Sequence, residues 1–384
     1  MRKIGVVTTS RADYGLYLPI LRKMANYPGL SLLLFVSGTH LLTDFGYTVE
    51  AIEAGGFPIA ARIEMIETSD TPEGIAKSMG FVTQGFARAY AAHLPDILLV
   101  LGDRYEMHAA AVAAIPFRIP IAHIHGGELT YGAMDELFRH SLTKISHLHF
   151  ASTEVYARRI IQMGEEPWRV VVSGAPGLDN IVSMPLMSRE SLEQRFGLDP
   201  SKPLILTTLH PTTQEGENTR QHIENLLNAL SAFHDFQILF TAPNADTNSS
   251  IIRTYIELFV ARCPDARFIV NLGTQAYFSI MAMAAVLVGN SSSGIIEAAF
   301  FQLPVVNVGT RQSGRIRGDN VIDSDYSAAE IISAMKKALS PKFKDSLQNL
   351  KNPYGDGQAT ERILSVLART PLENLLCKQF YEPP

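Results

Sequence analysis

Acidic and histidine side chains follow apolar runs in the first half of the sequence, and their types could support proton transfer. Asp103 follows the apolar run 97–101 after a single glycine, and His125 and Glu128 come at the end of the next apolar run. Asp135 follows within a short polar segment. Carboxylates beside an imidazole provide both proton acceptors and proton donors, because burial and mutual repulsion move their pKa values apart. We therefore expect Asp103, Glu106, His125, Glu128 and Asp135 to gather in one pocket, with Asp103, His125, Glu128 and Asp135 as the catalytic candidates.

Two further histidines, His40 and His210, also follow apolar runs, and we place His40 among the catalytic candidates. A histidine of this kind taken alone is more often structural. His123 and His125 are two residues apart in one predicted strand, so their side chains point to the same face. Together with a carboxylate they could form a metal site. The same spacing arises when one histidine packs in the core and the other points outward, and we favour this interpretation. We therefore expect no metal and no other cofactor.

Small, hydroxyl-rich turns supply a candidate phosphate site. The segment 289–294 reads Gly-Asn-Ser-Ser-Ser-Gly between an apolar run and a predicted helix. Free N–H groups at such a turn bind anions, so Asn290, Ser291 and Ser292 are candidates for contact with a diphosphate. Glu297 could accept hydrogen bonds from ribose hydroxyls, or its negative charge could simply interact with the positive end of the helix dipole. The sequence leaves both interpretations open.

Basic side chains accompany two other turns. Arg11 opens a helix after the first apolar run and could add a bidentate phosphate contact, although Ser10 or Asp13 could equally be an ordinary helix cap. Arg311 begins a glycine-punctuated basic loop that could clamp a diphosphate, whereas basic loops are usually solvated. The chain contains neither GxxxxGK[ST] nor GxGxxG after a strand, which argues against ATP and nicotinamide chemistry.

Short apolar strands and helix-period segments alternate along the chain and would position these residues. Strands are predicted at 4–8, 32–36, 97–101, 119–125, 204–209, 236–240, 268–270, 286–289 and 305–308, and helices at 15–27, 71–93, 105–117, 295–301 and 360–376. This alternation predicts βαβ units with parallel sheets. Ligands of such sheets bind beyond the carboxyl ends of the strands, which is where the candidate residues lie.

The length of 384 residues suits two domains, each with its own core. We predict an α/β fold of two Rossmann-like, doubly wound domains that face a central cleft. The first domain is expected over residues 1–180, with a returning C-terminal helix at about 360–384, and would carry the catalytic acids. The second domain is expected over residues 185–358.

Composition excludes several classes of protein. The net charge of -5 shows no basic excess, which argues against a nucleic-acid partner. Cys263 and Cys377 have neither metal-site nor disulfide spacing, so a reducing, cytoplasmic location is expected. No apolar segment reaches the ~18 residues that span a bilayer, so no membrane partner is expected.

Five segments, taken in order, resemble the signature of hydrolysing UDP-N-acetylglucosamine 2-epimerases, especially the bacterial branch for sialic-acid and legionaminic-acid sugars. These segments are 10–14, 102–106, 123–128, 289–294 and 309–312, and the resemblance runs from near residue 3 to near residue 360. It implies a glycosyltransferase-B-like fold and a homodimer or homotetramer. It also implies that UDP and N-acetylmannosamine are released by anti elimination to 2-acetamidoglucal and then hydration.

The resemblance further implies roles for single residues. The positions that match UDP-binding positions of the family, expected mostly in the second domain, are Arg11, Arg104, His210, Asn244, Ser291, Ser292, Glu297 and Arg311. Asp103, Glu128 and Asp135 match acidic positions tied to catalysis. Non-hydrolysing relatives and the animal enzyme carry glutamate in place of His125, whereas the bacterial hydrolysing branch shows the same His-x-His pattern. Glu128 is therefore expected to take over part of the work of that glutamate.

Three alternatives stay open beside the hydrolysis of UDP-N-acetylglucosamine: another substrate and two other functions. A UDP-2,4-diacetamido-2,4,6-trideoxyglucose could undergo the same reaction, since the motifs contact only UDP and the first two sugar carbons. A glycosyltransferase of the same fold would need an acceptor for turnover. A catalytically silent UDP-sugar-binding regulator is disfavoured, because many acids at one site are electrostatically costly without a function.

Overall fold

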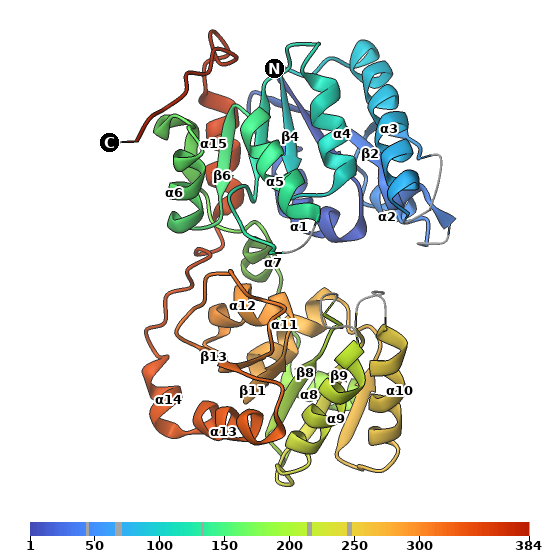
Figure 1. Ribbon diagram of the computed structural model, residues 1–384, viewed down its shortest axis with the longest axis vertical. Coiled ribbons are helices and arrows are strands. Elements are labelled where there is room, and N and C mark those ends of the chain that lie inside the picture. The colour runs from blue at the N-terminus through green and yellow to red at the C-terminus, as the bar shows by residue number, and fades with distance from the viewer. Residues whose placement is uncertain (44–45, 66–70, 132–133, 213–216, 244–247, 384) are drawn as a thin grey trace. The chain divides into compact units, whose positions relative to one another are not determined.

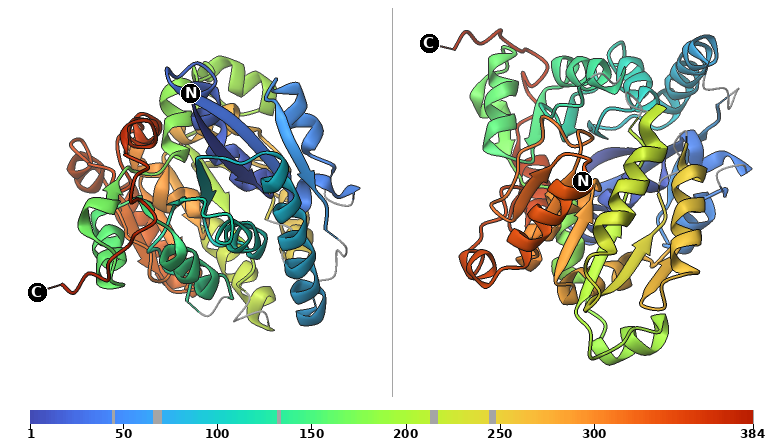
Figure 2. Two further views of the ribbon diagram at one scale, coloured as in Figure 1. Left: turned by 90° about the horizontal axis from the view of Figure 1, so that it is seen from above. Right: turned by 60° about the horizontal axis from the view of Figure 1, so that its bottom comes forward.

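The computed structural model describes residues 1–43, 46–65, 71–131, 134–212, 217–243 and 248–383. The chain divides into two compact units: unit 1 comprises Met1–Ser183 and Tyr354–Pro384, and unit 2 comprises Met184–Pro353. Each unit contains one parallel sheet with helices on its faces, so the α/β class with two Rossmann-like sheets is confirmed (Figures 1 and 2). Within the described ranges, no helix combines the length and apolarity needed to cross a membrane.

The sheet of unit 1 has seven strands in the order β3-β2-β1-β4-β5-β6-β7. Their bounds are β1 (Arg2–Thr8), β2 (Leu30–Ser37), β3 (Ile59–Ile63), β4 (Ile97–Leu101), β5 (Ile121–Ile124), β6 (Leu148–Ala151) and β7 (Val170–Val172). β4 is apolar and buried throughout, and β5 is buried throughout with one polar residue, His123, as strands covered on both faces require. The order reverses between β1 and β4, and this topological switch point is where doubly wound sheets bind ligands.

The helices of unit 1 form two packed layers with the sheet between them. The bounds are α1 (Arg11–Met24), α2 (Val49–Ala54), α3 (Pro72–Ala92), α4 (Tyr105–Ala114), α5 (Met134–Ile145), α6 (Glu154–Gln162), α7 (Gly177–Ser183) and α15 (Ala359–Arg369), with 3₁₀ turns η1 (Gly38–Leu41) and η3 (Pro167–Arg169). Buried side chains of α1, α2 and α15 share one core with the sheet. Those of α3, α4 and α5 share the other.

The last helix returns to unit 1, and Figure 1 shows it in red among the blue and green elements of that unit. α15 packs against α1 and α7, and Ile363, Leu364 and Leu367 are fully buried. It ends at Arg369 rather than at residue 376, because Pro371 cannot continue a helix. The following segment is held by the buried Arg169, which donates to the carbonyl oxygens of residues 375 and 377 at 2.9 and 3.0 Å.

Unit 2 repeats the same topology, with the order β10-β9-β8-β11-β12-β13. Its elements are β8 (Leu204–Thr208), β9 (Gln237–Thr241), β10 (Ala266–Ile269), β11 (Val286–Gly289), β12 (Val305–Val308) and β13 (Val321–Ser324), with α8 (Arg189–Phe196), α9 (Thr219–Leu230), α10 (Ser249–Val260), α11 (Thr274–Met283), α12 (Ser292–Ile296), η5 (Ala298–Phe301), α13 (Ala328–Leu339) and α14 (Pro341–Ser346). The predicted helix 295–301 is instead divided into α12 and η5. The switch point lies between β8 and β11, so the ends of these strands position the candidate phosphate site.

Candidate active site

Three neighbouring strands of unit 1 bring the predicted acid–base cluster together at their carboxyl ends. Asp103 follows β4, His125 and Glu128 follow β5, and Asp135 lies in the first turn of α5. β4, β5 and β6 are adjacent and parallel, so these ends lie side by side. The side chains are connected by hydrogen bonds and by charge interactions, which makes them a single cluster.

Arg139 of α5 is the cation that joins this cluster. Its side chain is buried, and its Nη2 donates to the carboxylate of Asp103 and, at 3.2 Å, to Thr130 Oγ1. Its Nη1 donates to the carbonyl oxygen of His125 at 2.9 Å, while the buried Nε has no partner among the described residues. A planar guanidinium can bond two acceptors in fixed directions, so Arg139 sets the distance between Asp103 and the backbone of His125.

His125, Glu128 and Ser152 form a buried chain of hydrogen bonds. His125 Nδ1 lies 2.7 Å from Glu128 Oε1, and Ser152 Oγ donates to the same oxygen at 2.7 Å. Because a carboxylate only accepts, Nδ1 carries the proton of a neutral His125, and Nε2 is left with a lone pair. His125 and Glu128 are 7% and 5% exposed, so this pair works in a medium of low dielectric constant.

The turn that carries this pair has an unusual backbone. His125 has φ +63, in the left-handed region that few side chains favour, and its N–H donates to the carbonyl oxygen of Phe150 at 3.1 Å. Gly127 has φ +73, and a Cβ there would lie 2.6 Å from the carbonyl oxygen of Tyr156. Only glycine therefore fits at Gly127, and the tight turn returns the chain so that Glu128 reaches His125.

Asp135 differs from Asp103 in its surroundings. Burial raises the pKa of Asp135, and the nearby negative charge of Asp103 raises it further. Asp103, in contrast, is bonded directly to Arg139. Two carboxylates with such different partners suit two different roles, one as an anion and one as a carrier of a proton.

His123 and His40 are both held inside the fold. His123 is fully buried and donates from Nε2 to the carbonyl oxygen of Gly102 at 2.7 Å, and burial lowers its pKa to about 3. His40 has Nε2 2.9 Å from Thr8 Oγ1 and Nδ1 2.7 Å from Thr48 Oγ1, and burial lowers its pKa to about 4. Both ring nitrogens of His40 are thus occupied, which suits a structural role. In the part of the chain that the structure describes, no group of three or more His, Cys, Asp or Glu side chains could hold a metal ion.

The two predicted phosphate-binding arginines of unit 1 differ in their freedom. Arg11 is exposed at the first position of α1, where Ser10 is the N-cap and accepts from the N–H of Asp13. Arg104 makes a bidentate ion pair with the fully buried Glu106, at 3.1 and 2.7 Å, while 40% of its own side chain stays exposed. Arg104 is therefore fixed in orientation and still accessible to an anion.

Asn290 organises the corresponding edge of unit 2. Its Oδ1 accepts from the N–H of His210 at 2.7 Å and its Nδ2 donates to the carbonyl oxygen of His210 at 2.8 Å. Its own carbonyl oxygen accepts from Arg311 Nη1 at 3.2 Å and from Gln312 Nε2 at 2.9 Å. Asn290 therefore holds the loops after β8, β11 and β12 together, and with them His210 and Arg311. Burial lowers the pKa of His210 to about 3, so its imidazole is neutral near pH 7.

The serine turn begins at a position that only glycine can occupy. Gly289 has φ +140, and a Cβ there would lie 1.9 Å from the carbonyl oxygen of Thr208. Ser291 follows as the N-cap of α12, and Ser292 is the first residue of this helix. Glu297 lies at the end of α12, where burial raises its pKa to about 7 and its Oε2 is buried without a hydrogen-bond partner in the described chain. Such an acceptor suits a ligand hydroxyl.

Comparison with known proteins identifies the family. The family described as UDP-N-acetylglucosamine 2-epimerase matches residues 22–368. The chain belongs to the UDP-N-acetylglucosamine 2-epimerase family. It is 40% identical over 375 residues to the UDP-N,N'-diacetylbacillosamine 2-epimerase (hydrolyzing) of Legionella pneumophila, covering 97% of each chain. It is 37% identical over 383 residues to the GDP/UDP-N,N'-diacetylbacillosamine 2-epimerase (hydrolyzing) of Campylobacter jejuni, covering 99% of each.

A solved structure shows the same fold. The crystal structure of UDP-GlcNAc 2-epimerase from Neisseria meningitidis bound to UDP-GlcNAc matches with a TM-score of 0.82 and 18% identity, over 96% of this chain and 100% of that one. The predicted glycosyltransferase-B-like fold and the resemblance to hydrolysing 2-epimerases are thus confirmed. The chain is an enzyme, a 2-epimerase of the hydrolysing type.

Some residues of this epimerase could not be predicted from the sequence, and one prediction lies outside the described residues. Asn244 falls in the segment 244–247, which the structure does not describe. Arg139, Ser152 and Gln312 were not predicted as site residues. The spacing of Arg139 from Asp135, one helical turn, was a usable signal for Arg139, whereas nothing near Ser152 or Gln312 in the sequence indicated their partners.

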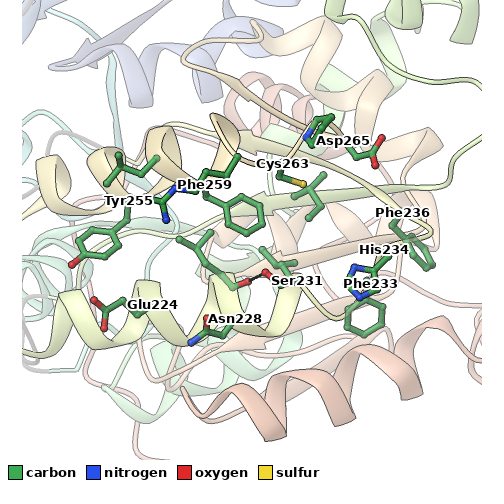
Figure 3. A pocket seen from close by; sticks show the side chains of 16 residues that line it. Glu224, Asn228, Ser231, Phe233, His234, Phe236, Tyr255, Phe259, Cys263 and Asp265 are labelled. Carbon is green, nitrogen blue, oxygen red and sulfur yellow. Dashed lines mark hydrogen bonds between the residues drawn. The ribbon is translucent and has the colours of Figure 1, made fainter.

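A cavity of about 680 Å³ lies in unit 2 of the epimerase, apart from its predicted site residues (Figure 3). It is lined by α9, α10 and the segments before β9 and β10, including Phe233, Tyr255, Phe259 and Cys263. These segments precede their strands, so the cavity lies toward the amino ends of the sheet. His210 and Asn290 lie at the carboxyl ends, and this cavity is therefore not the predicted phosphate site.

Proposed function

We propose that this epimerase hydrolyses a UDP-sugar with inversion at C2, and that the sugar is 2,4-diacetamido-2,4,6-trideoxyglucose. The observation that carries the choice of sugar is 40% and 37% identity, over nearly whole chains, to two hydrolysing epimerases named for UDP-N,N'-diacetylbacillosamine. UDP-N-acetylglucosamine, the first expectation from the motifs, becomes the second candidate. The solved structure that contains it is only 18% identical to this chain and supports the fold alone.

The proposed reaction consumes one water and needs no net oxidation. The C2–H bond and the C1–O bond break, the C2–H electron pair forms a C1=C2 double bond, and the C1–O electron pair leaves with UDP. Water then adds across the double bond of this 2-acetamidoglucal, with its oxygen at C1 and a proton on the opposite face of C2. The free sugar released has the manno configuration.

Unit 2 is proposed to bind the UDP part. Ser291 and Ser292 lie at the start of α12, where backbone N–H groups can bind an anion, and Asn290 holds this turn in place. Arg311, hydrogen-bonded to the carbonyl oxygen of Asn290, supplies positive charge for the diphosphate. Glu297 supplies a buried acceptor for ribose hydroxyls. His210, which is neutral near pH 7, contributes a directed hydrogen bond rather than a charge.

Unit 1 is proposed to act on the sugar, with Arg11 and Arg104 as further contacts for the leaving diphosphate. Asp103, bonded to Arg139, supplies a carboxylate that stabilises positive charge developing at C1 as the C1–O bond breaks. Asp135, with a raised pKa, carries a proton for C2 in the hydration step. His125 or a carboxylate removes the C2 proton in the first step.

Proton NMR in heavy water tests the proposal directly. The protein is incubated separately with UDP-2,4-diacetamido-2,4,6-trideoxyglucose and UDP-N-acetylglucosamine, without acceptor or cofactor, and Asp103→Asn is the negative control. Free UDP and a manno-configured sugar deuterated at C2, formed faster from the diacetamido substrate, support the proposal. Faster turnover of UDP-N-acetylglucosamine selects the second candidate. No turnover of either substrate refutes the hydrolysing epimerase and favours an acceptor-dependent glycosyltransferase.

We also propose a cytoplasmic homodimer or homotetramer. Cys263 is partly buried and Cys377 is exposed, and both are free thiols, as a reducing compartment allows. Light scattering coupled to size-exclusion chromatography measures the number of subunits. A monomer at micromolar concentration would contradict the oligomer.

A further inference from the structure

We infer that His125 Nε2 is the base that takes the C2 proton, and that Glu128 and Ser152 are positioning residues that fix its tautomer and orientation. This inference rests on the proposed function and assigns a step that the family resemblance leaves open. In that step the C2 proton moves to Nε2, the C2–H electron pair becomes the C1=C2 bond, and UDP departs with the C1–O pair. The result is a doubly protonated His125 beside Glu128.

The hydrogen bonds decide which ring nitrogen is basic. Glu128 Oε1 receives two donors, His125 Nδ1 and Ser152 Oγ, each at 2.7 Å. Two donors on one oxygen favour the ionised carboxylate, which can only accept, so the proton of neutral His125 resides on Nδ1. No hydrogen bond joins Nε2 to another described residue, so its lone pair is open to a substrate.

Burial makes the same pair suitable for the charge that the step creates. When Nε2 takes a proton, the ring becomes a cation, and its Nδ1 lies 2.7 Å from Glu128 Oε1. Glu128 is only 5% exposed. The attraction between these charges is larger in a buried site than in water. This carboxylate is in place before the reaction, so it stabilises the developing cation without reorganisation.

The backbone of His125 is an independent observation. A histidine at φ +63 is held against its conformational preference, and structures retain such residues mainly where function or tight packing requires them. Two hydrogen bonds maintain it, from its N–H to Phe150 and from Arg139 Nη1 to its carbonyl oxygen. The imidazole is therefore aimed both by its own backbone and by Glu128.

The other candidate bases of unit 1 are already committed. His40 has both ring nitrogens in hydrogen bonds with threonine hydroxyls. His123 is fully buried and donates to Gly102. Asp103 is bonded to Arg139, and Asp135 lies near the negative charge of Asp103, which together with burial raises its pKa. His125 Nε2 is the acceptor that these contacts leave available.

Variants that separate positioning from folding test the inference. His125→Asn removes the base and keeps a residue type that tolerates the left-handed backbone, and kcat is expected to fall by roughly 10²–10⁴-fold. Glu128→Gln removes the charge behind the ring, with an expected fall in kcat of about 10- to 100-fold. Ser152→Ala removes one neutral hydrogen bond, with an expected fall of about 2- to 10-fold. KM is expected to change little in each case.

Two matched controls come from the same unit. Glu165→Gln alters another fully buried glutamate that bonds a histidine, His149 at 3.1 Å, outside the cluster. Ser173→Ala removes a buried serine that follows β7 just as Ser152 follows β6, and whose hydroxyl, among the residues that the structure describes, donates to the backbone carbonyl oxygens of Ala151 and Gly174. These controls are expected to lower the melting temperature at most, and to leave kcat unchanged.

The deciding measurement is the isotope effect on kcat with substrate deuterated at C2. Glu128→Gln and Ser152→Ala slow proton removal, so the isotope effect rises above that of the wild type, while a purely structural loss leaves it unchanged. An unchanged isotope effect in Glu128→Gln, or full activity in His125→Asn, overturns the inference. Absence of wild-type turnover on both UDP-sugars would instead refute the proposed function, so the two failures are distinguishable.

Discussion

Replacing Arg139 with methionine removes the cation that connects Asp103 to the backbone of His125. The methionine side chain has a similar length and keeps most of the apolar contacts of the arginine stem. It leaves the Asp103 carboxylate, Thr130 Oγ1 and the carbonyl oxygen of His125 without their donor. The change is therefore mainly one of charge and hydrogen bonding.

The magnitude follows from the burial of the pair. Removing one partner of a buried ion pair costs about 3–5 kcal/mol. The lower end applies here because the Asp103 side chain remains 22% exposed, so water can solvate part of its charge. For a unit of roughly 200 residues, about 3 kcal/mol lowers the melting temperature by about 6–12 °C. The kcat of Arg139→Met is expected to fall as well, because Asp103 and His125 lose their common anchor.

Differential scanning calorimetry measures this loss, since two units can unfold in separate transitions. Arg189→Met is the control: this arginine forms an exposed ion pair with Glu193, for which about 0–1 kcal/mol is expected. If Arg139→Met melts within about 2 °C of the wild type and keeps its kcat, Arg139 neither stabilises unit 1 nor positions Asp103.

Three further predictions concern unit 2 and the C-terminal segment. Burial raises the pKa of Glu297 from its ordinary value of 4.5 to about 7, so the folded protein keeps a proton that the unfolded chain has released. The contribution of Glu297 to the free energy of unfolding is complete below pH 4.5 and is lost as the pH rises to about 7, a loss of up to about 3 kcal/mol. Urea unfolding measured at a series of pH values is expected to show no such loss in Glu297→Gln. Asn290→Ala removes both hydrogen bonds to the main chain of His210, and titration calorimetry is expected to show about tenfold weaker UDP binding; unchanged affinity would show that these loops need no such link. Deleting residues 375–384 removes two carbonyl acceptors of the buried Arg169, and the melting temperature of unit 1 is expected to fall by at least about 4 °C, whereas an unaltered scan would mean that this segment contributes nothing.

The α/β class and the positions of the central strands could be predicted, because buried central strands are continuous apolar runs. β4 and β11 have the bounds that their apolar runs predict. Four strands were not predicted. Three of them, β3, β7 and β13, lie at sheet edges and are half exposed, so they lack such a run. β6 is buried but short, with His149 in its middle, and only tertiary pairing with Glu165 makes that histidine acceptable in the core.

Roles within the site were harder to predict than positions. Glu128 was expected to act on the substrate itself, which stays a prediction, and its hydrogen bond to His125 Nδ1 could not be read from the sequence. Ser152 lies 24 residues from Glu128 and follows β6, which was not predicted, so no local pattern could link the two. The division of labour proposed for Asp103 and Asp135 rests on the hydrogen bond from Arg139 to Asp103, which is visible only in three dimensions.

Residues 184–353 are inserted between the two segments that build unit 1, and this has a consequence for how the chain is made. Synthesis runs from the N-terminus, so all of unit 2 leaves the ribosome before α15 does. Unit 2 can therefore complete its own core while the groove that will receive Ile363, Leu364 and Leu367 is still open. The nascent unit 1 must keep that apolar groove from aggregating until α15 is translated, so the unit that carries the proposed base matures after unit 2.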